Sequence, residues 1–210
     1  MEKNKIIYSQ LEENEEFYKK EFLKSLSENQ YADFSECLEI WNKNSSDKNV
    51  NEMFDNLKSN IEKFWLNPKY NNNINKEFNM LYFSHGGLFG GEIEAFAIDF
   101  NYDDDTLPVF DSMDERFNYL DNISAFPTCY LPLLIKLTNF IQDNTDKFEN
   151  YSDANETYNF FEATTMRELH KFLKKADQEN VFQSLKLKKP FYFAFAENDV
   201  GNAKLIYIIE

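Results

Sequence analysis

Residues 84–100, SHGGLFGGEIEAFAIDF, contain the residue types and spacing that most resemble a catalytic or ligand-binding loop. This stretch contains four of the five glycines and one of the two histidines of the chain. A phosphate-binding P-loop requires G-x-x-x-x-G-K-[ST], and a dinucleotide-binding loop requires G-x-G-x-x-G before a helix. Neither spacing is present, and Glu92 and Glu94 follow the glycines directly, where they would repel a phosphate. The glycines therefore do not predict a phosphate site.

The H-G-G pattern at 85–87 is also found in the oxyanion-hole segment of lipases and esterases. That chemistry needs a nucleophile on a G-x-S-x-G turn, which the chain lacks. The enzymatic alternative is a hydrolase that uses His85 and nearby carboxylates. The simpler interpretation is that Gly86–Gly91 turns the chain between two strands, because glycine adopts positive φ without steric cost. Phe89 would then lie at the turn, either buried or offered to a partner.

The carboxylates after the glycines raise the question of a metal site. Aspartate or asparagine at every second position of 99–105 resembles the start of an EF-hand loop, but Asp104 stands where that loop requires glycine. A solvated acidic loop is the simpler interpretation. His85 with Glu92 and Glu94 offers a transition metal one imidazole and no thiolate. We therefore expect no metal site and no cofactor.

Charge is distributed unevenly along the chain. The 22 basic and 37 acidic residues give a net charge of −15. Residues 92–121 contain ten acidic side chains and a single basic one, Arg116, whereas residues 167–189 contain seven basic and three acidic side chains. A chain this acidic is expected to repel nucleic acid and anionic membranes. Its field is expected to attract a basic protein or a cation.

The elements that position these residues follow from hydrophobic periodicity. Apolar residues at helical spacing predict helices within 11–26, 34–41, 53–65, 128–142 and 158–176, and Thr128 is a candidate N-cap. Strand patterns cover 78–84, 92–100, 190–196 and 203–210, with a short candidate strand from Val109. The last two strands flank Gly201 and predict a hairpin. Because both are apolar on both faces, we expect them in the interior of the sheet.

These elements predict an α+β fold with a helical N-terminal third, an antiparallel or mixed sheet with helices packed on it, and a C-terminal β-hairpin. The length predicts a single domain, 1–210, mainly helical over 1–67 and α+β over 78–210. Cys37 and Cys129 lie in predicted helices and are expected to be buried apolar residues. The N-terminus has no signal-peptide pattern and the longest apolar run is too short to span a bilayer, so we expect a cytoplasmic protein.

Residues 81–141 combine a glycine turn (HGGLFGG), a strand ending in aspartate (EAFAIDF), an acidic loop, a short PVF strand and a helix (YLPLLIKLTNFI). This order resembles the SUKH-type superfamily of bacterial immunity proteins. The helical N-terminus and the C-terminal hairpin lie outside the resemblance. The resemblance implies a small cytosolic protein that occludes a toxin, frequently a basic nuclease, and carries out no chemistry itself.

The sequence thus predicts a binding protein that neutralises a basic partner, a toxin domain, through its acidic middle segment and nearby aromatic residues. The candidate partner-binding residues are Phe89, Glu92, Glu94, Asp103, Asp104, Asp105, Asp111, Asp114 and Glu115. For each carboxylate taken alone, the simpler explanation is that its charge keeps the protein soluble. Besides the hydrolase, a self-associating structural or regulatory protein, a homodimer through exposed Phe and Tyr, remains an alternative.

Overall fold

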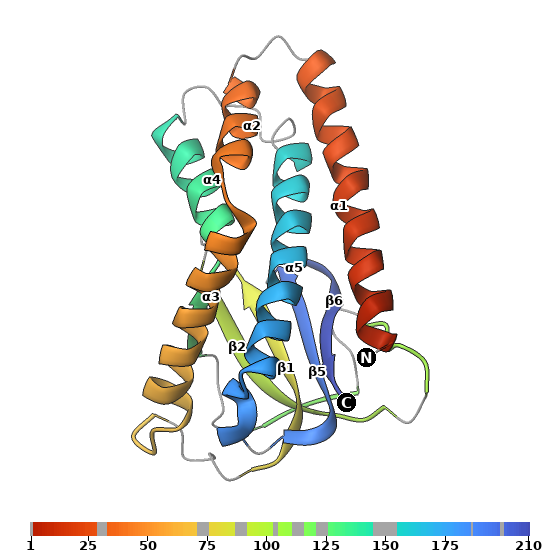
Figure 1. Ribbon diagram of the computed structural model, residues 1–210, viewed down its shortest axis with the longest axis vertical. Helices are drawn as coiled ribbons and strands as arrows, with labels where there is room; N and C mark the ends of the chain where they lie inside the picture. The colour runs from red at the N-terminus through yellow and green to blue at the C-terminus, as the bar shows by residue number, and fades with distance from the viewer. Residues whose placement is uncertain are drawn as a thin grey trace.

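The computed structural model describes residues 2–28, 33–70, 76–86, 92–102, 105–110, 116–120, 126–144, 155–185, 187–197 and 200–210. Within them the chain has an α+β fold of five α-helices, two short helical turns and six strands (Figure 1). The elements are α1 (Glu2–Glu28), α2 (Asp33–Lys43), α3 (Ser46–Asn60), a π-helical turn (Ile61–Trp65), β1 (Phe78–His85), β2 (Glu92–Phe100), β3 (Phe117–Tyr119), β4 (Phe126–Tyr130), α4 (Pro132–Asp143), α5 (Asn155–Gln178), a 3-10 turn (Val181–Ser184), β5 (Leu187–Glu197) and β6 (Val200–Ile209).

The N-terminal helices form where apolar side chains recur every three or four residues, as predicted. Between α2 and α3, Ser45 adopts an extended conformation and its Oγ accepts the backbone N–H of Lys48, so it caps the start of α3. The apolar stripe of α3 continues into the π-helical turn, where Trp65 is buried against Phe78 of β1. The helical layer is thereby joined to the sheet.

The sheet is mixed, and its strands lie in the order β3-β2-β1-β5-β6, with β4 pairing beside β3 on β2. β1 pairs in parallel with β5 and antiparallel with β2, and all eight residues of β1 are buried. His85 lies opposite Ile93, as expected for neighbouring strands joined by the glycine segment. Residues 87–91 of that segment lie outside the described residues.

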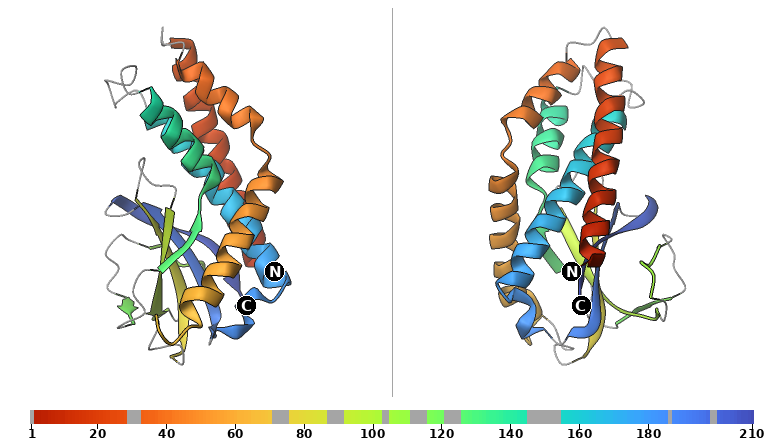
Figure 2. Two further views of the ribbon diagram at one scale, coloured as in Figure 1. Left: turned by 90° about the vertical axis from the view of Figure 1, so that its left-hand side faces the viewer. Right: turned by 45° about the vertical axis from the view of Figure 1, so that its right-hand side comes forward.

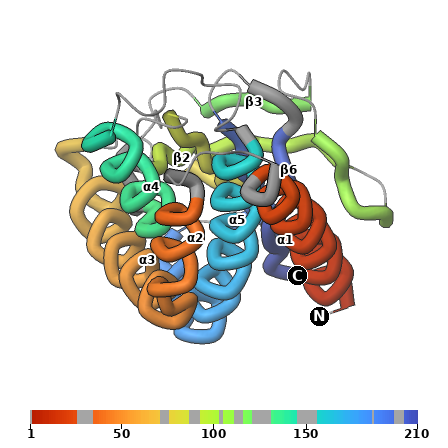
Figure 3. Tube along the Cα trace, turned by 90° about the horizontal axis from the view of Figure 1, so that it is seen from above, coloured from red at the N-terminus to blue at the C-terminus, as the bar shows by residue number. Residues whose placement is uncertain are grey.

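The helices cover one face of this sheet (Figures 2 and 3). Side chains of β1 alternate between the two faces. His85 faces the helices, since its Nε2 lies 3.0 Å from Glu162 Oε1 of α5. Tyr82 faces the opposite side, where its ring contacts Phe117 of β3. The helix-free face of the sheet is thus formed by Met80, Tyr82 and Ser84 of β1 and by their β2 partners Ile98, Phe96 and Glu94. Phe78, at the irregular start of β1, packs against Trp65 on the helix side instead.

The C-terminal hairpin is confirmed, because β5 and β6 pair antiparallel. β5 is interior as expected, but β6 lies at the end of the strand order, so its predicted interior position is wrong. Its apolar residues are buried because α1 and α5 pack against it. The Asn4 side chain of α1 also bonds to its backbone: Nδ2 donates to Ile208 O at 2.7 Å, and Oδ1 accepts Ile208 N–H at 2.9 Å. This contact blocks part of the exposed edge.

Two further expectations were wrong in detail. Residues 107–110 form no strand; Phe110 is buried against Phe100, so its apolar character reflects packing of an irregular segment. The helix expected from Thr128 begins at Pro132, and Thr128 and Cys129 lie in β4. Proline favours the first helical position and disfavours helical geometry in the residue before it, which sets this boundary.

At the start of β1, the Asn79 side chain makes the hydrogen bonds to β2 that a strand backbone would otherwise make. Its Nδ2 donates to Phe100 O at 2.7 Å, its Oδ1 accepts Phe100 N–H at 2.6 Å, and the side chain is buried. We predict that Asn79→Ala lowers the free energy of unfolding by about 2 kcal/mol, since both groups of Phe100 lose their partner. Urea unfolding measures this loss. Asn139→Ala on the exposed side of α4 is the control, expected within about 0.5 kcal/mol of wild type; equal losses would contradict the assignment.

Candidate functional site

Most of the predicted partner-binding residues lie outside the described residues: Phe89, Asp103, Asp104, Asp111, Asp114 and Glu115. Glu92 is the first residue of β2, and only its backbone is described. Glu94 and Asp105 are exposed. Glu94 pairs with Ser84 across the β1–β2 ladder and so belongs to the helix-free face of the sheet. The structure therefore places at least one predicted carboxylate on that face.

Aromatic side chains gather on the helix-free face. Phe96 of β2 contacts Tyr82 of β1 and Tyr119 of β3, with ring centroids 6.4 and 6.0 Å apart. Phe117 packs between Tyr82 and Tyr119 at 5.7 and 6.3 Å. Phe96 and Phe117 are half-buried, and Tyr119 is 51% exposed. We call Tyr82, Phe96, Phe117 and Tyr119 the aromatic face; it presents large apolar rings where the helices do not cover the sheet.

Arg116, the single basic residue of the acidic segment, serves the fold beside this face. Its guanidinium lies over the rings of Phe100 and Tyr102, at 5.2 and 5.6 Å from their centroids. Its Nη2 donates to Val109 O at 2.6 Å. These cation–π and hydrogen-bond contacts hold 100–102 and 109–110 together. Arg116 thus contacts residues 100–110 of its own segment, and Asp99 of the same segment pairs with Lys188 Nζ of β5 at 3.3 Å.

His85, the centre of the hydrolase alternative, lies on the opposite face. Its side chain is fully buried, stacks on Phe195 with ring centroids 4.8 Å apart and faces Glu162. Burial, with the carboxylates of Glu162 and Glu197, raises the pKa of nearby Tyr158 well above its usual range. Glu94, one of the carboxylates close to His85 in sequence, points to the other side of the sheet. A substrate would reach His85 only by displacing this packing.

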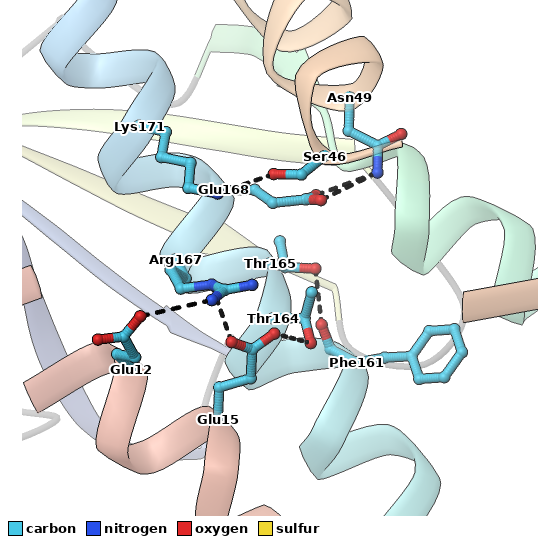
Figure 4. A network of polar contacts seen from close by, with 10 residues as sticks. All are labelled: Glu12, Glu15, Ser46, Asn49, Phe161, Thr164, Thr165, Arg167, Glu168 and Lys171. Carbon is cyan, nitrogen blue, oxygen red and sulfur yellow. Dashed lines mark hydrogen bonds and ion pairs between the residues drawn. The ribbon is translucent and has the colours of Figure 1, made fainter. Parts of the chain in front are cut away.

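A network of charged and polar residues, which the sequence did not predict as a cluster, connects α1, α3 and α5 (Figure 4). Glu15 Oε2 of α1 lies 2.8 Å from Arg167 Nε of α5, and Glu15 Oε1 accepts the Thr164 hydroxyl at 2.8 Å. One turn along α5, the Glu168 carboxylate accepts Asn49 Nδ2 of α3 at 3.1 and 3.2 Å. Burial raises the pKa of Glu168 to about 7.

The network borders a polar pocket of about 300 Å³. Its lining residues are Trp41, Asn42, Asn44, Ser46, Leu133, Thr164, Arg167 and Glu168. Each charged side chain of the network nevertheless pairs with a neighbouring helix: Arg167 with Glu15, and Lys171 with Ser46 at 3.1 Å. We therefore assign the network to the packing of the helices. A signal for it was present in the sequence, because Glu15 interrupts the apolar stripe of Leu11 and Phe22.

Within the described residues, no group of three or more His, Cys, Asp and Glu side chains is arranged to hold a metal ion. None of the described helices is both long and apolar enough to cross a bilayer. Comparisons of the chain with protein-family models, with curated proteins and with solved structures find no match. The aromatic face, with Glu94 beside it, is the feature from which a function is inferred.

Proposed function

We propose that this chain is a cytoplasmic, non-enzymatic immunity-type protein that binds and occludes a basic partner, a toxin domain. The partner would dock on the aromatic face, and its basic side chains would pair with the acidic segment, residues 92–121. Nucleic acid and membrane are not its targets under this proposal. The observation that carries it is the exposure of Tyr119 beside half-buried Phe96 and Phe117, on a face that none of the described helices covers.

Aromatic rings supply much of the affinity of protein interfaces when a polar rim excludes water around them. Here Tyr119 and Phe96 offer such rings, while exposed Glu94 lies on the same face. Complementary charge accelerates the encounter with a basic partner and orients it, without adding greatly to affinity. The net charge of −15 favours a basic partner over an acidic one. The resemblance to the SUKH-type superfamily leads to the same proposal.

The geometry favours this proposal over the hydrolase, and an experiment in solution separates it from the homodimer. A hydrolase built on His85 would need a substrate to enter the helix-facing core, where Phe195 and Glu162 enclose the imidazole. A homodimer through exposed aromatic residues would use the same aromatic face, and sedimentation of the isolated protein over a range of concentrations distinguishes it. Association without any partner would support the homodimer instead.

The test measures binding to the protein encoded immediately upstream of this gene. We predict that Glu94→Lys combined with Asp105→Lys lowers the association rate constant by about tenfold or more at low salt, because it reverses two exposed charges.

We also predict that Tyr119→Ala raises the dissociation rate constant about tenfold, since it removes an aromatic anchor. Biolayer interferometry at low and high salt measures both constants, and affinity should fall as salt rises.

The matched control is Glu13→Lys combined with Glu16→Lys. Both glutamates are exposed on α1, and the change in net charge is the same. Binding of this variant should stay within about threefold of wild type, because the two charges are not on the aromatic face. Equal effects of the two double variants would reject the site, and no binding of the upstream protein by wild type would reject that partner.

A further inference from the structure

A groove of about 550 Å³ lies between the N-terminal part of α1, the C-terminal part of α5 and β6. Figure 1 shows these three elements side by side at the end of the molecule where both termini lie. The lining residues are Asn4, Lys5, Tyr8, His170, Lys171, Lys174, Asp177, Gln178 and Tyr207. The volume falls within the range of small-molecule sites.

The charge of the groove is opposite to that of the chain. Lys5, Lys171 and Lys174 line it, and the single carboxylate among its lining residues is Asp177. That carboxylate already accepts the Tyr207 hydroxyl at 3.0 Å. The Lys171 ammonium donates to Ser46 of α3 at 3.1 Å, so, among the described residues, Lys5 and Lys174 supply the free charges of the groove. In a protein of net charge −15, two ammonium groups against one paired carboxylate form a local positive field. Such a field selects an anion.

His170 adds a polarised ring to this groove. Its Nδ1 lies 2.8 Å from Ile206 O, and because a carbonyl oxygen only accepts, Nδ1 carries a hydrogen. In the neutral ring Nε2 is then an acceptor, and after protonation it becomes a second donor. Burial and the charge of Lys174 lower the pKa of His170. An anion beside Lys174 would offset that charge and so change the electrostatic environment of the imidazole.

Aromatic side chains form the wall beside the lysines. The Tyr8 ring lies 5.2 Å from the His170 ring, and the Tyr207 ring lies 5.3 Å from it on a near-perpendicular plane. Tyr8 is half-buried, so part of its surface remains accessible. Tyrosine rings bind planar groups by stacking, while lysines bind phosphates as point charges. The groove thus combines the contacts for a ring with those for a polyanion.

We propose that this groove binds a nucleoside diphosphate, with its phosphates between Lys5 and Lys174 and its base against Tyr8. The site is separate from the aromatic face, because β6 and β3 are at opposite ends of the strand order. It therefore does not depend on the proposed partner-binding function. A nucleotide here would contact α1, α5 and β6 together.

The test uses ADP, inorganic pyrophosphate and adenosine as probes in isothermal titration calorimetry. ADP should bind more tightly than pyrophosphate, and adenosine should bind most weakly. Lys174→Gln and Lys5→Gln should each weaken ADP binding about tenfold, the effect of losing one charge-assisted contact. The control is Lys175→Gln on another side of α5, where Lys175 donates to Asn51 and lies over Phe54. Its ADP affinity should stay within about twofold of wild type.

Nuclear magnetic resonance of the wild-type protein provides a readout that needs no variant. The chain has two histidines, so ADP should shift the ring signals of His170 and leave those of His85 in place. Absence of ADP binding at millimolar concentration, or equal losses in Lys174→Gln and Lys175→Gln, would overturn the site. Pyrophosphate binding as tightly as ADP would overturn the nucleotide assignment, since the ring would contribute nothing.

Discussion

Glu15→Ala is expected to lower the free energy of unfolding by about 3–5 kcal/mol, the cost of removing one partner of a buried ion pair. The Glu15 side chain is 3% exposed, and its two oxygens contact Arg167 and Thr164 across the α1–α5 interface. Alanine there would leave the guanidinium of Arg167, whose side chain is only 23% exposed, beside an empty space and without its nearest carboxylate. Urea unfolding near pH 7 measures the loss.

Glu12 provides the matched control, because it contacts the same arginine from the same helix. Its Oε1 lies 3.8 Å from Arg167 Nη1, and its side chain is 52% exposed. Solvent screens such a pair, so Glu12→Ala should cost less than about 1 kcal/mol. A double variant, Glu15→Met with Arg167→Met, should recover much of the stability lost in Glu15→Ala, since it buries no unpaired charge. Equal losses for Glu12→Ala and Glu15→Ala would contradict the assignment of Glu15 as the principal partner.

The sequence predicted the α+β fold because local periodicity determines most of its elements. Apolar spacing located α3 through Met53 and Leu57, and alternating or continuous apolar runs located β1, β2 and the C-terminal hairpin. Boundaries were less predictable where an apolar run joins two elements, as at Pro132, which separates β4 from α4. The edge position of β6 depends on α1, which lies almost the whole chain length away, and no local pattern carries that information.

The candidate sites depended even more on distant residues. Glu15 pairs with a residue 152 positions along the chain, and Asn49 with one 119 positions along, so helix packing alone brings them together. Local signals existed: polar Glu15 and Glu168 occupy helix positions in line with buried apolar neighbours such as Leu11 and Phe161. The cation–π contacts of Arg116 with Phe100 and Tyr102 could not be predicted either, because they form only when the chain folds back on itself.

Glu168→Gln is expected to stabilise the protein above neutral pH, although it removes a charge from a polar network. Burial, and to a lesser degree the charge of Glu15, raise the pKa of Glu168 from 4.5 to about 7. Asn49, Lys171 and Arg167 lower this pKa, but they do not outweigh burial. The folded state therefore binds this proton more tightly than the unfolded state does. The associated stability is fully present below about pH 4.5 and is lost as pH rises through about 7. At 1.36 kcal/mol per pKa unit, the loss is about 3 kcal/mol.

The surroundings of Glu168 explain why a neutral side chain fits there. Asn49 donates to both carboxylate oxygens, while its own Oδ1 is buried and has no hydrogen-bond partner among the described residues. A protonated carboxyl, or the amide of glutamine, supplies the missing donor to Asn49 Oδ1 and still accepts from Nδ2. Either group thus satisfies a buried acceptor that the ionised carboxylate leaves without a donor.

The test compares urea unfolding of wild type and Glu168→Gln from pH 5 to pH 8. The two proteins should be nearly equally stable at pH 5, and the variant should be more stable by about 2–3 kcal/mol at pH 8. Glu179→Gln, an exposed residue just beyond α5, changes the net charge equally and should keep the wild-type pH profile. Parallel profiles for wild type and Glu168→Gln would show that the carboxylate ionises normally, because the lysine and arginine beside it would then outweigh its burial. If the unfolding free energies of the two proteins instead converge toward low pH, the proton that Glu168 of α5 binds beside Asn49 of α3 stabilises this fold in acid.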